Sequence, residues 1–161
     1  ILMSARLDKN PGLFKDKNNF AGSTSFVDFN LVWGTLVQIF SFYSVLNHPF
    51  AKAAYIMFVM SEVHSFLDGN GRIARVMMNA ELVSGCQSKI IIPTVYSEDY
   101  MGALKKLTKQ RKCDTYIKML QRTHENSANV YDENMDDMEQ HLSSCNAFIE
   151  DAEVILIIVS R

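Results

Sequence analysis

Residues 64–75, HSFLDGNGRIAR, bring a histidine, a carboxylate, two glycines around an asparagine and two arginines onto one short segment. A histidine side chain has an ordinary pKa near neutral, so His64 suits the role of a general base acting on a nucleophilic hydroxyl. Asp68 is a hard oxygen ligand, and Mg²⁺ typically binds one or two carboxylates together with substrate phosphates. The segment therefore combines a candidate base with a candidate metal ligand four residues later.

The second half of this segment is suited to hold an anion. Gly69 and Gly71 on either side of Asn70 let the backbone approach a ligand closely, and the helix predicted next offers free N–H groups to phosphate. Arg72 and Arg75 lie on its first turn, where guanidinium groups bind phosphate oxygens in pairs. Cations are unfavourable at a helix start unless an anion lies between them and the dipole. The pattern indicates phosphoryl or nucleotidyl transfer from a nucleotide.

The alternatives for this segment are a calcium loop, a P-loop or protein-kinase site, and a plain corner between two helices. A calcium loop counted from Asp68 would need an oxygen ligand, a glycine and a glutamate where Arg72, Ile73 and Asn79 stand. The chain has no GxxxxGK[ST] loop, which argues against a P-loop, and it lacks the protein-kinase motifs. The residue types also allow an ordinary corner between two helices with surface charges, because Asp-Gly and Asn-Gly pairs form turns.

Composition bounds the class of protein. The chain has 161 residues, of which 48% are apolar, and a net charge of −2, which fits one globular domain and argues against general nucleic-acid or acidic-membrane binding. Three widely spaced cysteines without a CxxC motif favour a reducing, cytoplasmic location. The opening ILMSAR reads as an element cut in the middle, so we expect a fragment of a longer protein.

The pattern predicts a mostly helical chain with one irregular insertion. Residues 9–26 are rich in turn formers and predict turns or a hairpin. A helix over 28–46, capped by Asp28, is so dense in apolar residues that we expect it to be buried nearly all round. Further helices are predicted over 49–63, 71–83, 97–111, 114–126 and 134–149. The apolar stretch 154–159 is compatible with a strand, a packed tail or an added tail.

The twelve residues resemble the signature of the Fic family, His-Pro-Phe-x-Asp/Glu-Gly-Asn-Gly-Arg-x-x-Arg, with Ser65 where proline is usual. NPGLFKDKNNFAG at 10–22 resembles the family's flap hairpin, and YMGAL at 100–104 resembles the segment after its motif helix. The resemblance covers most of residues 1–125 and implies an all-α Fic-like helical bundle with a β-hairpin flap at about 10–26. Residues 126–161 would form a C-terminal helix and a tail, either packed on this core or foreign to it.

The resemblance also implies an activity, the Mg²⁺-dependent transfer of AMP from ATP to a hydroxyl of a target protein or of the chain itself. His64 would deprotonate that hydroxyl, Asp68 would hold magnesium, and Tyr100 would lie near the nucleotide base. The anion hole would be formed by Gly69, Asn70 and Gly71, and the β- and γ-phosphates would contact Arg72 and Arg75. The flap would register the target by strand addition, through Lys17, Asn18, Asn19, Phe20, Ala21 and Gly22.

Two further readings stay open at this stage. The chain could be a nucleotide-binding regulatory module without turnover, or it could remove AMP from modified proteins with the same site. The family is often inhibited by a helix that carries Ser/Thr-x-x-x-Glu-Gly/Asn, and the sequence contains no such string. We therefore expect any inhibitory helix to come from an upstream segment or from an antitoxin-like partner chain.

Overall fold

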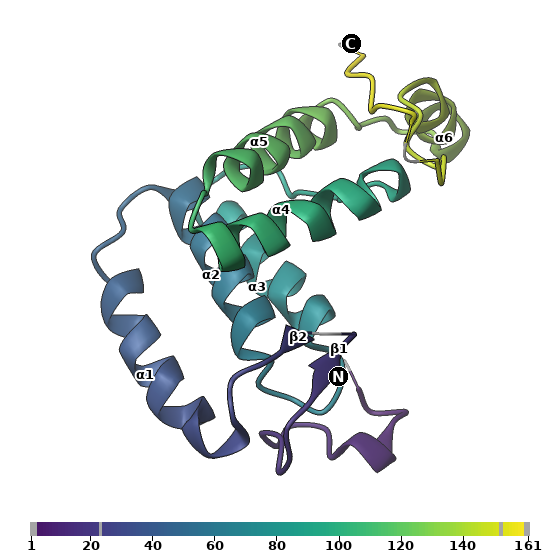
Figure 1. Cartoon of the computed structure of the whole chain (residues 1–161). Helices are drawn as coiled ribbons and strands as arrows, with labels where there is room; N and C mark the ends of the chain where they lie inside the picture. The colour runs from purple at the N-terminus through teal and green to yellow at the C-terminus, as the bar shows by residue number, and fades with distance from the viewer. Residues whose placement is uncertain (1–2, 23, 152, 160–161) are drawn as a thin grey trace. The chain divides into compact units, whose positions relative to one another are not determined.

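The computed structural model describes residues 3–22, 24–151 and 153–159 of the chain (Figure 1). In these ranges it holds six α-helices and a two-stranded antiparallel sheet near the N-terminus. This confirms the predicted helical fold class with a small hairpin. The chain divides into two compact units, within residues 1–87 and 88–161.

The first unit begins with irregular chain and the predicted hairpin. After the short 3₁₀ helix η1 (Leu7–Lys9) come strands β1 (Phe20–Ala21) and β2 (Thr24–Ser25). Phe20 lies opposite Ser25 and Ala21 opposite Thr24. Gly22 in the turn has a φ of 58°, which favours glycine. Only the tip of the predicted region is strand, and residues 10–19 form the turns that lead into it.

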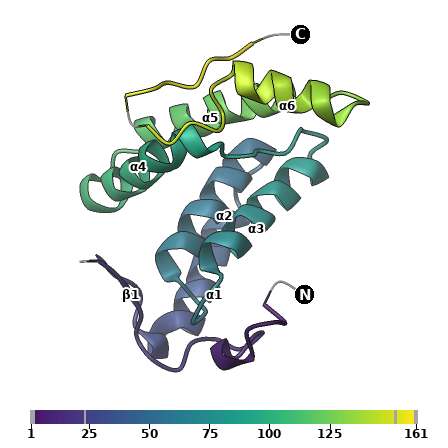
Figure 2. The ribbon, with the colours of Figure 1, turned by 90° about the vertical axis from the view of Figure 1, so that its right-hand side faces the viewer.

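Helices α2 (Pro49–Val63) and α3 (Asn70–Ser84) form the centre of this unit and pack side by side (Figures 1 and 2). The His48 side chain accepts the Phe50 N–H and proline occupies the first helical position, so α2 begins where the sequence predicts. A Cβ on Gly85, which ends α3, would lie 2.4 Å from Pro49. The glycine therefore lets the end of α3 approach the start of α2. Their buried apolar residues are Ala53, Ala54, Met57, Val59, Met60, Val63, Ala74, Met78 and Leu82.

Helix α1 (Val32–Tyr43) follows the 3₁₀ turn η2 (Phe29–Leu31), and Asp28 caps that turn by accepting the Asn30 N–H. The prediction that this helix is buried nearly all round is wrong. Trp33 is 69% exposed and Phe40 66% exposed, while Val32 is its one buried residue among those described. The physical reason is that α1 packs mainly against α2 and η2, which leaves its other sides uncovered.

The second unit contains η3 (Thr94–Tyr96), α4 (Ser97–Gln110), α5 (Asp114–Ala128) and α6 (Met135–Ser144). Helices α4 and α5 pack against each other. Residues 154–159 form no strand with the described residues. They run as an extended tail whose Leu156 is fully buried in a cluster with Val95, Tyr96 and Cys145. Across the described residues, every helix is too short or too polar to cross a bilayer.

Candidate active site

His64 lies at the C-terminal cap of α2, where its φ of 51° turns the chain into the loop before α3. Its ring stacks on Phe26, with centroids 3.7 Å apart and planes 11° apart. The ring Nδ1 is 3.1 Å from the Ser61 carbonyl oxygen. A carbonyl only accepts hydrogen bonds, so Nδ1 carries the hydrogen and Nε2 keeps the free lone pair. The imidazole is therefore held in the tautomer that a general base at Nε2 requires.

The electrostatic surroundings of His64 favour the neutral ring. Burial lowers the pKa of His64 below its usual value, and the positive charge of Lys15 lowers that pKa further. The Ser61 carbonyl and the Asp68 carboxylate act in the opposite direction but do not outweigh burial. A ring that stays neutral at physiological pH can accept a proton from a hydroxyl.

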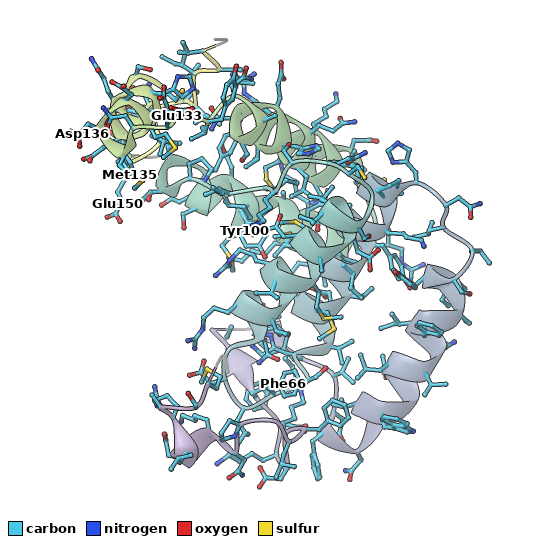
Figure 3. All side chains as sticks on the ribbon, turned by 180° about the vertical axis from the view of Figure 1, so that it is seen from behind. Phe66, Tyr100, Glu133, Met135, Asp136 and Glu150 are labelled. Carbon is cyan, nitrogen blue, oxygen red and sulfur yellow. The ribbon has the colours of Figure 1, made fainter. Side chains whose placement is uncertain are left out.

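The loop after His64 is closed by the side chain of Asn70. Its Oδ1 accepts the Phe66 N–H at 2.9 Å and its Nδ2 donates to the Phe66 carbonyl at 2.8 Å. Asn70 is only 2% exposed. The sequence predicted Asn70 as part of an anion hole, and the structure commits its side chain to the loop, so only its backbone N–H is left for that role. Figure 3 labels Phe66 in this loop.

The amino end of α3 is suited to bind an anion. Gly69, its N-cap, has a φ of 80° and provides no side-chain cap. A Cβ on Gly71 would meet only the Arg75 guanidinium, at 3.6 Å, so the backbone there is open to a ligand. Arg75 is exposed and has no carboxylate at ion-pair distance among the described residues. Free N–H groups and an unengaged guanidinium together favour phosphate.

Asp68 lies beside this turn with its carboxylate partly exposed. It accepts the Gly69 N–H and lies 3.6 Å from Arg72 Nη2 and 3.8 Å from Arg6 Nη1. No group of three or more histidine, cysteine, aspartate or glutamate side chains in the described residues could hold a metal ion. A single carboxylate fits Mg²⁺ that is shared with nucleotide phosphates and water, which is how this ion is commonly held.

The predicted flap residues divide into two groups. Asn18 bonds Asp28 and the Phe29 N–H, and Asn19 bonds Lys15 and the Phe66 carbonyl, so both asparagines hold the hairpin in place. Exposed to solvent are Lys17, Phe20, Ala21 and Gly22. Registration of a target by this exposed group stays a prediction.

Tyr100 belongs to the second unit, on α4 (Figure 3), and is 9% exposed. Its role near a nucleotide base therefore stays a prediction.

The sequence did not predict three neighbours of His64: Phe26, Ser61 and Lys15. The Ser61 partner is a backbone carbonyl, which any residue at that position would supply, and nothing local marks Lys15 or Phe26.

Ser65 occupies the position where the family signature has proline. Its carbonyl accepts the Lys15 N–H at 2.9 Å. The residue is fully buried, and its hydroxyl oxygen has no hydrogen-bond partner among the described residues. An unpaired buried hydroxyl destabilises a fold, so this substitution adds a polar group that the loop does not use.

Comparison with known proteins agrees with this geometry. The sequence model of the Fic/DOC family matches residues 1–82. A Fido domain-containing protein of Dictyostelium discoideum is 33% identical over 78 residues, which are 45% of this chain and 54% of that protein. The protein adenylyltransferase Fic of Drosophila persimilis is 38% identical over 58 residues, which are 36% of this chain and 11% of that protein. The match thus spans about half the length of the first relative and about a tenth of the length of the second.

Solved structures share the fold at low sequence identity. The Fic-1 structure from C. elegans has a TM-score of 0.65 and 17% identity, and the match covers 90% of this chain and 40% of that one. A Fic domain containing signaling protein from Bacteroides thetaiotaomicron has a TM-score of 0.57 and 18% identity, and the match covers 83% of this chain and 49% of that one. Identities this low support the fold alone.

Proposed function

The chain belongs to the Fic/DOC family, and from that premise we propose that it is a protein adenylyltransferase, which transfers AMP from ATP to a hydroxyl group of a target protein. One observation carries the proposal. The His64 ring, with Nδ1 held by Ser61, stands at the end of α2, and the loop after it leads directly to an uncapped helix start that bears Arg72 and Arg75. Relatives named protein adenylyltransferases support the same reaction.

The proposed reaction is a single displacement at the α-phosphorus of ATP. The oxygen of the target hydroxyl forms a bond to that phosphorus, and the bond from phosphorus to the bridging oxygen of the β-phosphate breaks. Nε2 of His64 takes the hydroxyl proton. Pyrophosphate leaves with the electron pair of the broken bond, held by Arg72, Arg75 and the N–H groups of α3.

Magnesium would be held by Asp68 and would supply positive charge to the phosphates. The chain's own contribution is orientation, because the Asn70 bonds fix the loop between the base and the anion site.

The exposed strand β1 would pair with an extended target segment. ATP is then a co-substrate, and the cysteine pattern favours a reaction in the cytoplasm.

The test compares ATP labelled at the α-phosphate with ATP labelled at the γ-phosphate. We expect the full chain with Mg²⁺ to incorporate the α-label into protein, with the chain itself as first acceptor, and to leave the γ-label in pyrophosphate. His64→Ala should abolish incorporation. His124→Ala is the matched control, because that histidine lies on α5 and bonds the Ser88 carbonyl. Equal labelling by wild type and His64→Ala would overturn the proposal, and ATP binding without any label would favour a regulatory module.

A further inference from the structure

Lys15 is a buried cation at the base of the flap. The residue is only 3% exposed, and its ammonium donates to Asn19 Oδ1 at 2.8 Å and to the Val63 carbonyl at 3.3 Å. Removing a charge from water is costly, and an apolar side chain of similar volume often replaces a buried charge without loss of stability. Burial of the charge by itself therefore does not explain why a lysine stands here. The hydrogen-bond partners of Lys15 indicate a role instead.

The flap bonds to backbone carbonyls on both sides of His64. Besides the ammonium bond to Val63, the Lys15 N–H donates to the Ser65 carbonyl at 2.9 Å, and Asn19 Nδ2 donates to the Phe66 carbonyl at 2.9 Å. The backbone that carries the candidate base is thus bonded to the flap immediately before and immediately after His64. The ring of Phe14, with its centroid 5.7 Å from that of Phe66, covers the same junction.

Lys15 and Asn19 lie just before the exposed strand β1 in the sequence. Asn19 is followed by Phe20, the first residue of β1. Asn18 fixes the opposite side of the hairpin by donating to Asp28 and accepting the Phe29 N–H. The position of β1 relative to the backbone around His64 is therefore set by a short chain of hydrogen bonds.

We propose that Lys15 and Asn19 are positioning residues that lock the flap to the loop of His64, so that a target segment paired with β1 presents its hydroxyl to Nε2. The inference rests on the proposed function and adds how the target is aligned. A flexible junction would let the bound segment drift relative to the base, and displacements near 1 Å can cost about 100-fold in rate.

The first experiment separates alignment of the target from chemistry on ATP. Lys15→Met removes the cation, and Asn19→Asp keeps an acceptor for Lys15 but loses the donor to Phe66. Lys15→Arg is the conservative rescue, and Lys118→Met removes an exposed lysine from α5 as the control. Each full-length variant receives α-labelled ATP and Mg²⁺, and two products are measured: label on protein, and free AMP formed when water replaces the target hydroxyl.

We expect Lys15→Met and Asn19→Asp to lower protein labelling at least tenfold while free AMP formation stays within twofold. Lys15→Arg should recover most of the labelling, and Lys118→Met should match wild type. Because water needs no docking on β1, only transfer to protein depends on the lock. A parallel loss of both products, or labelling that is unchanged in Lys15→Met, would overturn the inference.

Hydrogen exchange tests the lock independently of the proposed function. In Lys15→Met, amides over residues 15–21 should exchange at least tenfold faster than in wild type, while amides of α5 should not change. If wild type produces neither product, the proposed reaction fails, and faster exchange in this variant still supports the lock as a structural coupling. Unchanged exchange over 15–21 would overturn it.

Discussion

The loop after α2 and helix α1 are held in opposite ways. In the loop, Lys15, Asn19 and Asn70 bond backbone atoms of residues 63–66, and these bonds are buried or part-buried. Residues 29–51, which include α1, contain no aspartate, glutamate, lysine or arginine, yet several large apolar side chains there are exposed. Hydrogen bonds hold the loop in place, whereas α1 carries large apolar side chains that are exposed.

This difference shows what each region can tolerate. A hydrogen bond to a given backbone atom fixes direction as well as distance, so the loop can hold the backbone of His64 in one orientation. Helix α1 is fixed to its neighbours at a few points, such as Tyr43 Oη donating to Glu81 at 2.6 Å and Tyr55 Oη donating to the Ile39 carbonyl at 3.2 Å. Substitutions should therefore matter greatly in the loop and little on most of α1.

Asn70→Ala should have the largest effect on folding. It removes both bonds to Phe66. The Phe66 carbonyl keeps its bond from Asn19, but the part-buried Phe66 N–H loses its partner, and the two lost bonds together should cost about 3 kcal/mol. Chemical denaturation measures the loss. Asn47→Ala, at an exposed position between α1 and α2, is the control and should change stability by less than about 0.5 kcal/mol. Similar losses in the two variants would contradict the role given to Asn70.

Gly71→Ala should separate activity from stability. The new methyl group meets only Arg75 at an ordinary contact distance, and alanine in a helix stabilises by about 0.5–1 kcal/mol relative to glycine. The methyl group would stand where phosphate must approach, so labelling should fall about 100-fold. Gly34→Ala in α1, where a Cβ meets nothing within 4 Å, should gain similar stability with full activity. Full activity in Gly71→Ala would remove the anion site from this turn.

Two valines of α1 test its one-sided burial. Val32 is 1% exposed and Val37 is 57% exposed. Val32→Ala should cost about 2 kcal/mol from lost apolar burial and the cavity left behind. Val37→Ala should stay within about 0.5 kcal/mol. Equal costs in thermal unfolding of the two variants would mean that the outer face of α1 is covered in solution.

Ser65→Ala tests the one buried polar group of the loop that has no partner among the described residues. Removing the hydroxyl should raise the free energy of unfolding by about 1 kcal/mol without changing the rate of labelling. Ser88→Ala, at an exposed position, should change neither quantity. A loss of stability in Ser65→Ala would show that the hydroxyl has a partner in solution.

The pH dependence of labelling should show the smallest effect. Because burial lowers the pKa of His64 below its usual 6.5, the ring stays neutral, and able to accept a proton, to lower pH than a free imidazole. The acidic limb of kcat/KM should therefore lie below pH 6.5, and more than half of the rate at pH 8 should remain at pH 6.5. An acidic limb above pH 6.5 would contradict the neutral ring.

The sequence predicted what depends on nearby residues. Pro49 marks the start of α2 and Gly85 the end of α3, and the twelve residues from His64 to Arg75 form the junction between these two helices. These signals are local, so a single sequence contains them. The helices predicted over 97–111 and 114–126 are observed over 97–110 and 114–128, with Ser97 and Asp114 as their first residues rather than as their caps.

The remainder depends on contacts between residues far apart in the chain. The buried Lys15 bonds the Val63 carbonyl, 48 residues away, and the stacking of Phe26 on His64 joins two distant segments. The exposure of α1 could not be predicted either, because dense apolar residues indicate a buried surface whether or not the chain itself supplies the cover. Side-chain partners, rather than helix positions, were the part that sequence could not provide.

We propose that a triphosphate binds at the amino end of α3 with its α-phosphorus facing His64. A crystal structure of the chain with Mg²⁺ and a non-hydrolysable ATP analogue would show whether it does. We expect the β- and γ-phosphates to contact Arg72 and Arg75, and Nε2 of His64 to be directed at the space beside the α-phosphorus. A triphosphate bound away from this turn, or a His64 ring whose Nε2 is turned away from it, would disprove this arrangement.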